Sequence, residues 1–202
     1  MNCVSKIIFL LIAFLQLSLT DLIIDSDLTF EQAIKGTSAP KEITDSLVLL
    51  NVVYYSFDGK LHRGQLVVNQ SVQKDIEEIF ELIRNERFPV DKCIPIVKYN
   101  WSDSASMANN NTSSFNYRTI AGTNRLSLHS YGLAVDINPV NNPVIYSDGR
   151  ISPKGAKYNP KKKGTFISDC SIVKKFKELG WRWGGEFNSF KDYHHFDKIL
   201  SK

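Results

Sequence analysis

Two short stretches of the chain concentrate side chains that can bind a metal ion. The first, residues 127–136, contains His129 and Asp136, which are seven positions apart. A neutral imidazole nitrogen and a carboxylate oxygen are both good zinc ligands. Their spacing excludes the one-turn pairing of a His-Glu-x-x-His zinc helix, and that motif occurs nowhere in the sequence.

Gly132 lies between these two residues and permits a backbone conformation that other residues avoid. Residues 133–137 then alternate in the manner of a partly buried strand. We therefore expect His129 in a loop or short turn and Asp136 on a strand, with their side chains converging. A catalytic zinc takes three protein ligands and keeps one position open for water, so one more ligand is needed.

The second stretch, residues 192–197, supplies a carboxylate and two imidazoles. Asp192 and His195 are three positions apart, and the aromatic residues 193 and 196 can anchor the segment against the core. If His195 completes the metal shell, Asp192 falls beside the water in the open position. His194 and His195 would lie on opposite faces of a strand, so only one of them can readily face the metal.

Together the stretches carry the patterns Ser-x-His-x-x-Gly-x-Ala-x-Asp and Asp-x-x-His-Phe. In this order they closely resemble the zinc D-alanyl-D-alanine carboxypeptidase and L-alanyl-D-glutamate endopeptidase family, peptidase family M15. The resemblance extends upstream through residues 105–118 and 121–126, and so covers roughly residues 88–197. An ordered set of motifs is far more specific than any one of them.

The resemblance implies a role for each residue that matches the family's pattern. Zinc is the implied cofactor, and the implied roles are zinc ligand for His129, Asp136 and His195, general base for Asp192, substrate or oxyanion contact for Arg118, and substrate binding for Ser127. The match to Asp-x-x-His-Phe selects His195 over His194, which stands where relatives often have proline. Asp197 replaces a frequent glutamate, which is a conservative change.

The chain divides into three regions. Residues 1–20 combine Lys6, an apolar run at 7–17 and small residues near Thr20, which is typical of a secretory signal peptide cut near Thr20. The run is too short for a comfortable membrane span, and an uncleaved anchor is the alternative. Residues 21–45 are expected to form a leader that docks on the domain or stays mobile, and residues 46–202 to form the zinc peptidase domain.

Periodicity predicts a mixture of helices and hairpins. The expected strands are 47–55, 61–68, 94–99 and 115–120, with a hairpin turn at 57–60. The first expected helix is capped by Asn69 or Ser71, and its apolar residues repeat from 72 to 83. Residues 105–111 are expected to form a loop or a short helix. The last expected helix is capped by Ser168 or Asp169 and ends at Gly180. The resemblance implies an α+β fold, with a small, mainly antiparallel sheet, flanking helices and the zinc site at one end of the sheet.

Residues 139–165 form a long, weakly patterned segment with several lysines. A loop of this length is usually functional or mobile, so it either covers the cleft and favours anionic wall polymers or is a solvated loop without a partner. Nucleic acid is a poor fit, because the basic run at 161–163 is brief and lacks interleaved aromatic residues. Cys93 and Cys170 either pair in an oxidising compartment or remain free thiols, since pairing requires Cα atoms within about 7 Å.

These expectations describe a secreted or periplasmic enzyme with no stable membrane span after signal cleavage. Its substrate would be a peptidoglycan stem peptide, cut as by a D-alanyl-D-alanine carboxypeptidase or, alternatively, by an L-alanyl-D-glutamate endopeptidase. A non-catalytic, zinc-bearing module that binds the cell wall is the competing class. Asp192 discriminates between these classes, because a binding module has no need for a base beside the water.

Overall fold

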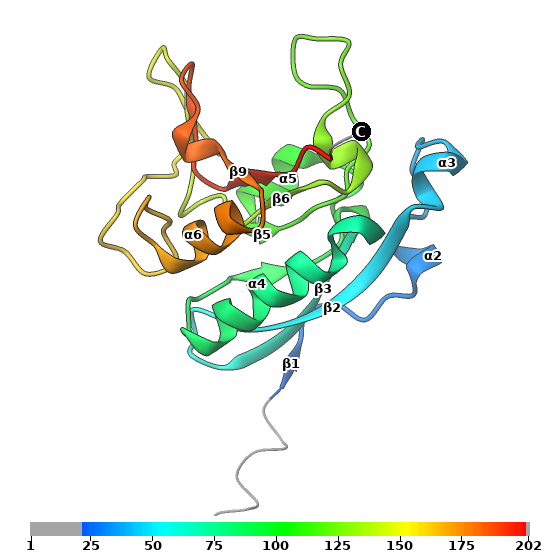
Figure 1. Ribbon diagram of the computed structural model, residues 1–202, viewed down its shortest axis with the longest axis horizontal. Helices are drawn as coiled ribbons and strands as arrows, with labels where there is room; N and C mark the ends of the chain where they lie inside the picture. The colour runs from blue at the N-terminus through cyan, green and yellow to red at the C-terminus, as the bar shows by residue number, and fades with distance from the viewer. Residues whose placement is uncertain (1–21, 201–202) are drawn as a thin grey trace, which may run out of the picture.

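A computed structural model describes residues 22–200 (Figure 1). The predicted signal peptide, residues 1–20, lies outside the described residues. Across the described range, short helices and short strands are interspersed, which confirms the expected α+β character. No helix within residues 22–200 is long and apolar enough to cross a membrane.

The N-terminal half is organised around a long hairpin. Strands β2 (Leu47–Tyr55) and β3 (Leu61–Asn69) pair antiparallel, as the sequence predicted. Alternate residues of β2, among them Leu50, Val52 and Tyr54, are buried, because side chains on a strand point to opposite faces. The leader also docks, since β1 (Ile23–Ile24) adds to β3 as a parallel third strand.

Helix α4 (Gln73–Asn85) covers one face of this hairpin (Figure 1). It follows the short 3-10 helix η1 (Gln70–Val72), and the Asn69 side chain accepts a hydrogen bond from the backbone N–H of Ser71. Its buried residues recur three or four positions apart, so they form one apolar stripe that packs on the sheet. These residues are Ile76, Ile79, Phe80 and Ile83.

The C-terminal half carries the candidate residues Asp136, Asp192 and His195 on two small sheets. Strands β6 (Ala134–Asp136), β11 (His195–Asp197) and β9 (Arg182–Trp183) form one antiparallel sheet in the order β6-β11-β9. Strands β10 (Lys191–Asp192), β7 (Val144–Ile145) and β8 (Ile151–Ser152) form another, in the order β10-β7-β8. The segment 139–165 therefore contributes two short strands, β7 and β8, to the sheet that contains Asp192.

The last helix, α6 (Ser171–Glu178), packs against the β6-β11-β9 sheet. Its buried residues Ile172, Val173 and Phe176 join the core cluster of α4, and the Phe176 ring stacks on Phe196 of β11 with ring centroids 3.9 Å apart. Cys170, and not Ser168 or Asp169, occupies the N-cap position, and its side chain makes no capping hydrogen bond. Gly180 follows the helix with a φ of +82°, as expected of a helix stop.

Two predicted strands are wrong. Residues 94–99 contain the 3-10 helix η2 (Ile96–Tyr99), because Pro95 fixes its own φ and begins a helical turn directly after the short strand β4 (Lys92–Cys93). Residues 115–120 run as a loop after β5 (Asn111–Thr112). Phe115 N–H donates to Val67 O of β3, but the next residues bond to the segment around His129: Asn116 N–H donates to His129 O and Arg118 N–H to Ser130 Oγ.

The expected single sheet is also replaced by several. Across residues 22–200, the strands form four small sheets, most of them built from strands of two or three residues. The remaining short helices are α2 (Phe30–Ala33) and α3 (Lys41–Thr44) in the leader, α5 (Asp103–Ala108), η3 (Leu128–Tyr131) and η4 (Gly184–Glu186). Cys93 and Cys170 are free thiols, and burial raises the pKa of the Cys93 thiol well above its usual value.

Candidate metal centre

His129 is presented by the short helix η3, which the sequence forms through its two ends. Ser127 Oγ accepts a hydrogen bond from the His129 N–H at 3.3 Å, so it caps the first turn. Gly132 ends the helix with a φ of +67°. A Cβ atom at position 132 would lie 2.6 Å from the backbone nitrogen of Asn69, so only glycine fits. The prediction of a short turn for His129 is confirmed.

Asp136 and His195 face each other across a strand pair. They are register partners at one end of the β6–β11 ladder, with Asp136 at the last position of β6 and His195 at the first position of β11. Phe196, the next residue on β11, is fully buried and packs on α6. Because side chains alternate along a strand, anchoring Phe196 in the core turns His195 to the opposite face, where Asp136 lies.

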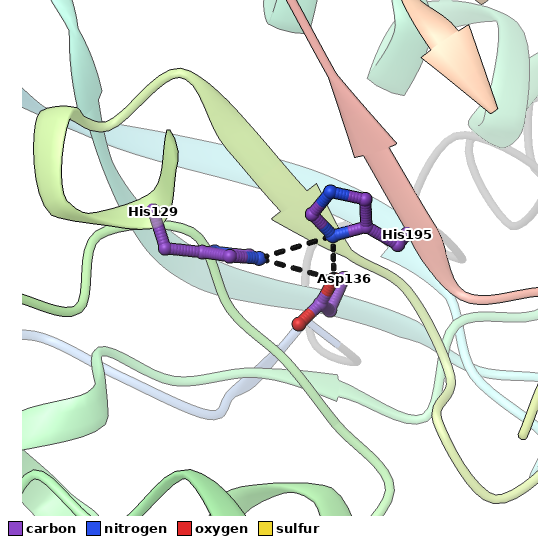
Figure 2. Close-up of side chains that lie close together, drawn as sticks. All are labelled: His129, Asp136 and His195. Atoms are coloured by element: carbon purple, nitrogen blue, oxygen red, sulfur yellow. Dashed lines mark hydrogen bonds and ion pairs between the residues drawn. The ribbon is translucent and has the colours of Figure 1, made fainter. Parts of the chain in front are cut away.

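The three side chains converge on one point (Figure 2). His195 Nδ1 lies 2.9 Å from Asp136 Oδ1 and 3.2 Å from His129 Nε2, and the last two atoms are 3.3 Å apart. The three offered donor atoms all lie within 4.8 Å of one another. Among the described residues, this is the group of three or more such side chains that could hold one metal ion.

The orientation of His129 fits metal binding. Its Nδ1 donates to the backbone oxygen of Ser114 at 2.6 Å, so Nε2 carries the lone pair that points at the cluster. His129 and Asp136 are 2% and 4% exposed, so neither is a loose surface group. Two imidazole nitrogens and one carboxylate oxygen form the donor set of a catalytic zinc site.

The charges of the cluster residues depend on one another. Burial lowers the pKa of His195, but its hydrogen bonds to Asp136 and Asp197 outweigh this and raise the pKa to about 10. Burial likewise raises the pKa of Asp136, but the imidazoles of His129 and His194 hold it well below its usual value. A bound cation would take over the role of the proton on His195, so the residues present fit a divalent metal.

Asp192 lies beside this cluster on the neighbouring sheet. His194 Nε2 is 3.0 Å from Asp192 Oδ1 and 3.9 Å from Asp136 Oδ2. The contact between His194 and Asp192 is close but lacks hydrogen-bond geometry. Asp192 Oδ1 is buried and has no hydrogen-bond partner among the described residues. Burial raises the pKa of the Asp192 carboxyl above its usual value, against the opposing effect of His194 and His195.

Asp192 is held by its backbone. It pairs with Val144 of β7, which ties the strand of Asp192 to the segment 139–165. Gly184, at the start of η4, packs directly against it: a Cβ atom at position 184 would lie 2.4 Å from Asp192 O and 2.8 Å from its Cβ. The close approach of η4 to β10 therefore requires a residue without a side chain.

The alternation of side chains predicted that His194 lies on the opposite face of a strand from His195, and this prediction is wrong. Strand β11 begins at His195, so His194 belongs to the turn before it and the alternation of side chains does not apply. It is 2% exposed, and its Nδ1 donates to Asn142 O at 2.7 Å. Both histidines thus face the site, His195 in the cluster and His194 between the two carboxylates.

Arg118 and Ser127 lie outside the cluster of His129, Asp136 and His195. An Nη2 atom of Arg118 lies 3.2 Å from Asp103 Oδ2 on α5, and its buried Nε has no hydrogen-bond partner among the described residues. The backbone of Arg118 bonds to Ser130, next to His129. Ser127 is 6% exposed and caps η3, so its observed contact is structural.

A cavity of about 700 Å³ is lined by residues of the α6–β9–η4 region, among them Arg182 and Phe187. His129, Asp136 and His195 do not line it. Arg182 pairs with Asp197, and the Phe187 ring centroid is 6.1 Å from that of His195. The cavity therefore borders residues that contact Asp197 and His195.

The three residues offer a donor set that could hold one metal ion, and a second carboxylate, Asp192, lies beside them. Comparison with family models indicates the class of protein. Residues 121–198, which contain both candidate stretches, match the model described as D-alanyl-D-alanine carboxypeptidase. Residues 121–198 are therefore similar to peptidase family M15, in agreement with the resemblance that the motifs carry. Comparisons with curated proteins and with solved structures gave no match.

Sequence reasoning missed the residues that support the cluster. The alternation of β11 places Asp197 on the same face as His195, which was a readable signal. Arg182 and Gly184 carried no signal, because their importance arises from strand and helix contacts between segments distant in sequence.

Proposed function

We propose that the protein is a zinc metallopeptidase that hydrolyses peptidoglycan stem peptides, most closely as a D-alanyl-D-alanine carboxypeptidase. The observation that carries this proposal is the convergence of His129, Asp136 and His195 beside the buried carboxylate of Asp192, inside the segment that matches the peptidase family. His129 Nε2, Asp136 Oδ1 and His195 Nδ1 would hold the ion.

Zinc, when bound, supplies a Lewis acid for the scissile carbonyl and makes water more acidic. Asp192 supplies the base. Within residues 22–200 its Oδ1 has no hydrogen-bond partner, so it can accept a proton from the attacking water. The same oxygen then returns this proton to the amine nitrogen as the C–N bond breaks. The raised pKa of Asp192 suits a group that must first accept and then donate a proton.

Arg118 would seat an anionic part of the substrate. Its guanidinium is paired with one carboxylate, on Asp103, and its side chain is 31% exposed, so it remains accessible. A guanidinium presents a rigid fork of donors that matches a carboxylate. In a carboxypeptidase it would bind the terminal carboxylate, and in an L-alanyl-D-glutamate endopeptidase it would stabilise the developing oxyanion.

Export of the mature chain is part of the proposal, since the substrate lies outside the cell membrane. It is supported by the signal-peptide pattern of residues 1–20. Cleavage near Thr20 would leave a chain that begins at Asp21, just before the described residues.

The test is mass spectrometry of purified muropeptides incubated with the zinc-loaded protein. We expect loss of one terminal alanine, and we expect Asp192→Asn to bind zinc normally but leave the muropeptides intact. Asp148→Asn is the matched control, because Asp148 is an exposed carboxylate on the β7–β8 turn, and it should cleave like the parent. A fragment cut next to glutamate would identify the endopeptidase instead. Intact muropeptides with a zinc-loaded parent would refute hydrolysis and identify a binding module.

A further inference from the structure

The two candidate histidine ligands are supported differently on the side away from the cluster. His129 Nδ1 donates to a neutral acceptor, the backbone oxygen of Ser114. His195 Nε2 instead lies 3.1 Å from a carboxylate oxygen, Asp197 Oδ2. A carboxylate that accepts the N–H of an imidazole makes the opposite ring nitrogen more basic and fixes which nitrogen is protonated.

Asp197 is itself held by an arginine fork. Arg182 donates from Nε to Asp197 Oδ1 at 2.7 Å and from Nη2 to Asp197 Oδ2 at 2.8 Å. The two residues are register partners on β9 and β11, so the strand pairing sets their alignment. Asp197 is 4% exposed, and such a buried carboxylate needs partners of this kind. Two parallel N–H···O bonds to one carboxylate also restrict its rotation.

We infer that Asp197 and Arg182 are positioning residues that set the affinity of the centre for its metal. Arg182 fixes the Asp197 carboxylate, Asp197 holds the Nε2–H of His195, and Nδ1 is thereby turned toward Asp136 Oδ1 and His129 Nε2, where it would bind the ion. The inference rests on the proposed metal centre. It adds an outer pair, Asp197 and Arg182, to the three residues that would bind the ion.

The direct test is the dissociation constant for zinc, measured by competition with a chromophoric chelator in the absence of substrate. Asp197→Asn should weaken zinc binding by about 10- to 100-fold, the usual effect of losing such a partner. Asp197→Glu keeps a carboxylate and should recover part of the loss. Asp148→Asn is the matched control, because Asp148 also pairs with an arginine, Arg150 at 2.6 Å, but on an exposed turn.

Arg182→Lys is a second, milder variant that tests the inference even if Asp197→Asn fails to fold. The Arg182 side chain is 52% exposed, and lysine keeps the charge while removing the two-pronged fork. It should bind zinc more weakly than the parent but more tightly than Asp197→Asn. Histidine ¹H–¹⁵N correlation spectra add a readout that a merely structural role would not change. In the zinc-loaded protein, the His195 Nε2–H signal should be protected from exchange with solvent in the parent and should exchange faster in Asp197→Asn.

The outcomes separate the inference from the proposed function. Equal zinc affinities for the parent and Asp197→Asn, or an unchanged exchange rate of the His195 Nε2–H, would overturn the inference and leave the peptidase proposal intact. A parent that binds no zinc would overturn both. A parent that binds zinc with the expected order of variants, but leaves muropeptides intact, would support the inference and refute only the hydrolysis.

Discussion

Gly184 gives the sharpest test of how the base is placed. A methyl group at this position would lie 2.4 Å from Asp192 O, whereas ordinary contact begins at 3.4 Å, so the two segments must separate by about 1 Å. Overpacking of this kind costs about 1–3 kcal/mol of stability. A displacement of about 1 Å at a catalytic group can lower the rate roughly 100-fold. Gly184→Ala should therefore bind zinc like the parent but cleave muropeptides about 100-fold more slowly.

The control is a glycine with the same crowding at a different place. A Cβ atom at Gly64 on β3 would lie 2.3 Å from the backbone oxygen of Cys93, far along the chain from Asp192. Gly64→Ala should lose a similar free energy of unfolding in urea, yet keep the parent's turnover number per folded molecule. If both variants slow cleavage equally, or if Gly184→Ala retains full turnover, the assignment of Gly184 to the placement of Asp192 is wrong.

Two further outcomes concern stability. Zinc at 100 times its dissociation constant should raise the free energy of unfolding by about 2.7 kcal/mol, and Asp136→Asn should abolish the gain; equal gains in urea titrations would contradict the proposed ligand set. His62 is 8% exposed, and although burial lowers its pKa, hydrogen bonds to Asp25 and Asp58 raise the pKa above the usual value. The pairing therefore stabilises the fold fully below about pH 6.5 and loses this effect as the pH rises through the folded-state pKa. The parent's advantage over His62→Gln should shrink from pH 6 to pH 9, and a constant difference would contradict it.

The sequence predicts the local elements best where the apolar period is long. The hairpin of β2 and β3 and the stripe of α4 follow from patterns of nine or more residues, and both are observed. The strands of two or three residues are too short to show any period. The predicted strand at 94–99 fails for a related reason, because apolar residues in a short run suit a buried 3-10 turn as well as a strand.

The cluster could be predicted, but its surroundings could not. The order of the motifs suffices to bring His129, Asp136 and His195 together as candidates, and the structure does bring them together. The predicted separation of His194 from the site depended on where β11 begins, and a boundary of one residue is beyond pattern reasoning. The pairing of Asp197 with Arg182 depends on strand register between distant segments, which no local period encodes.

The candidate ligands and the candidate base belong to different sheets. Asp136 and His195 lie on the β6-β11-β9 sheet, and Asp192 lies on the β10-β7-β8 sheet, with only residues 193 and 194 between β10 and β11. A mutation in the hairpin of β7 and β8 therefore acts on the strand pairing that holds Asp192, whereas Asp136 and His195 are held by a different strand pair. In this architecture, an enzyme could lose its catalytic base in few evolutionary steps and still bind its metal ion.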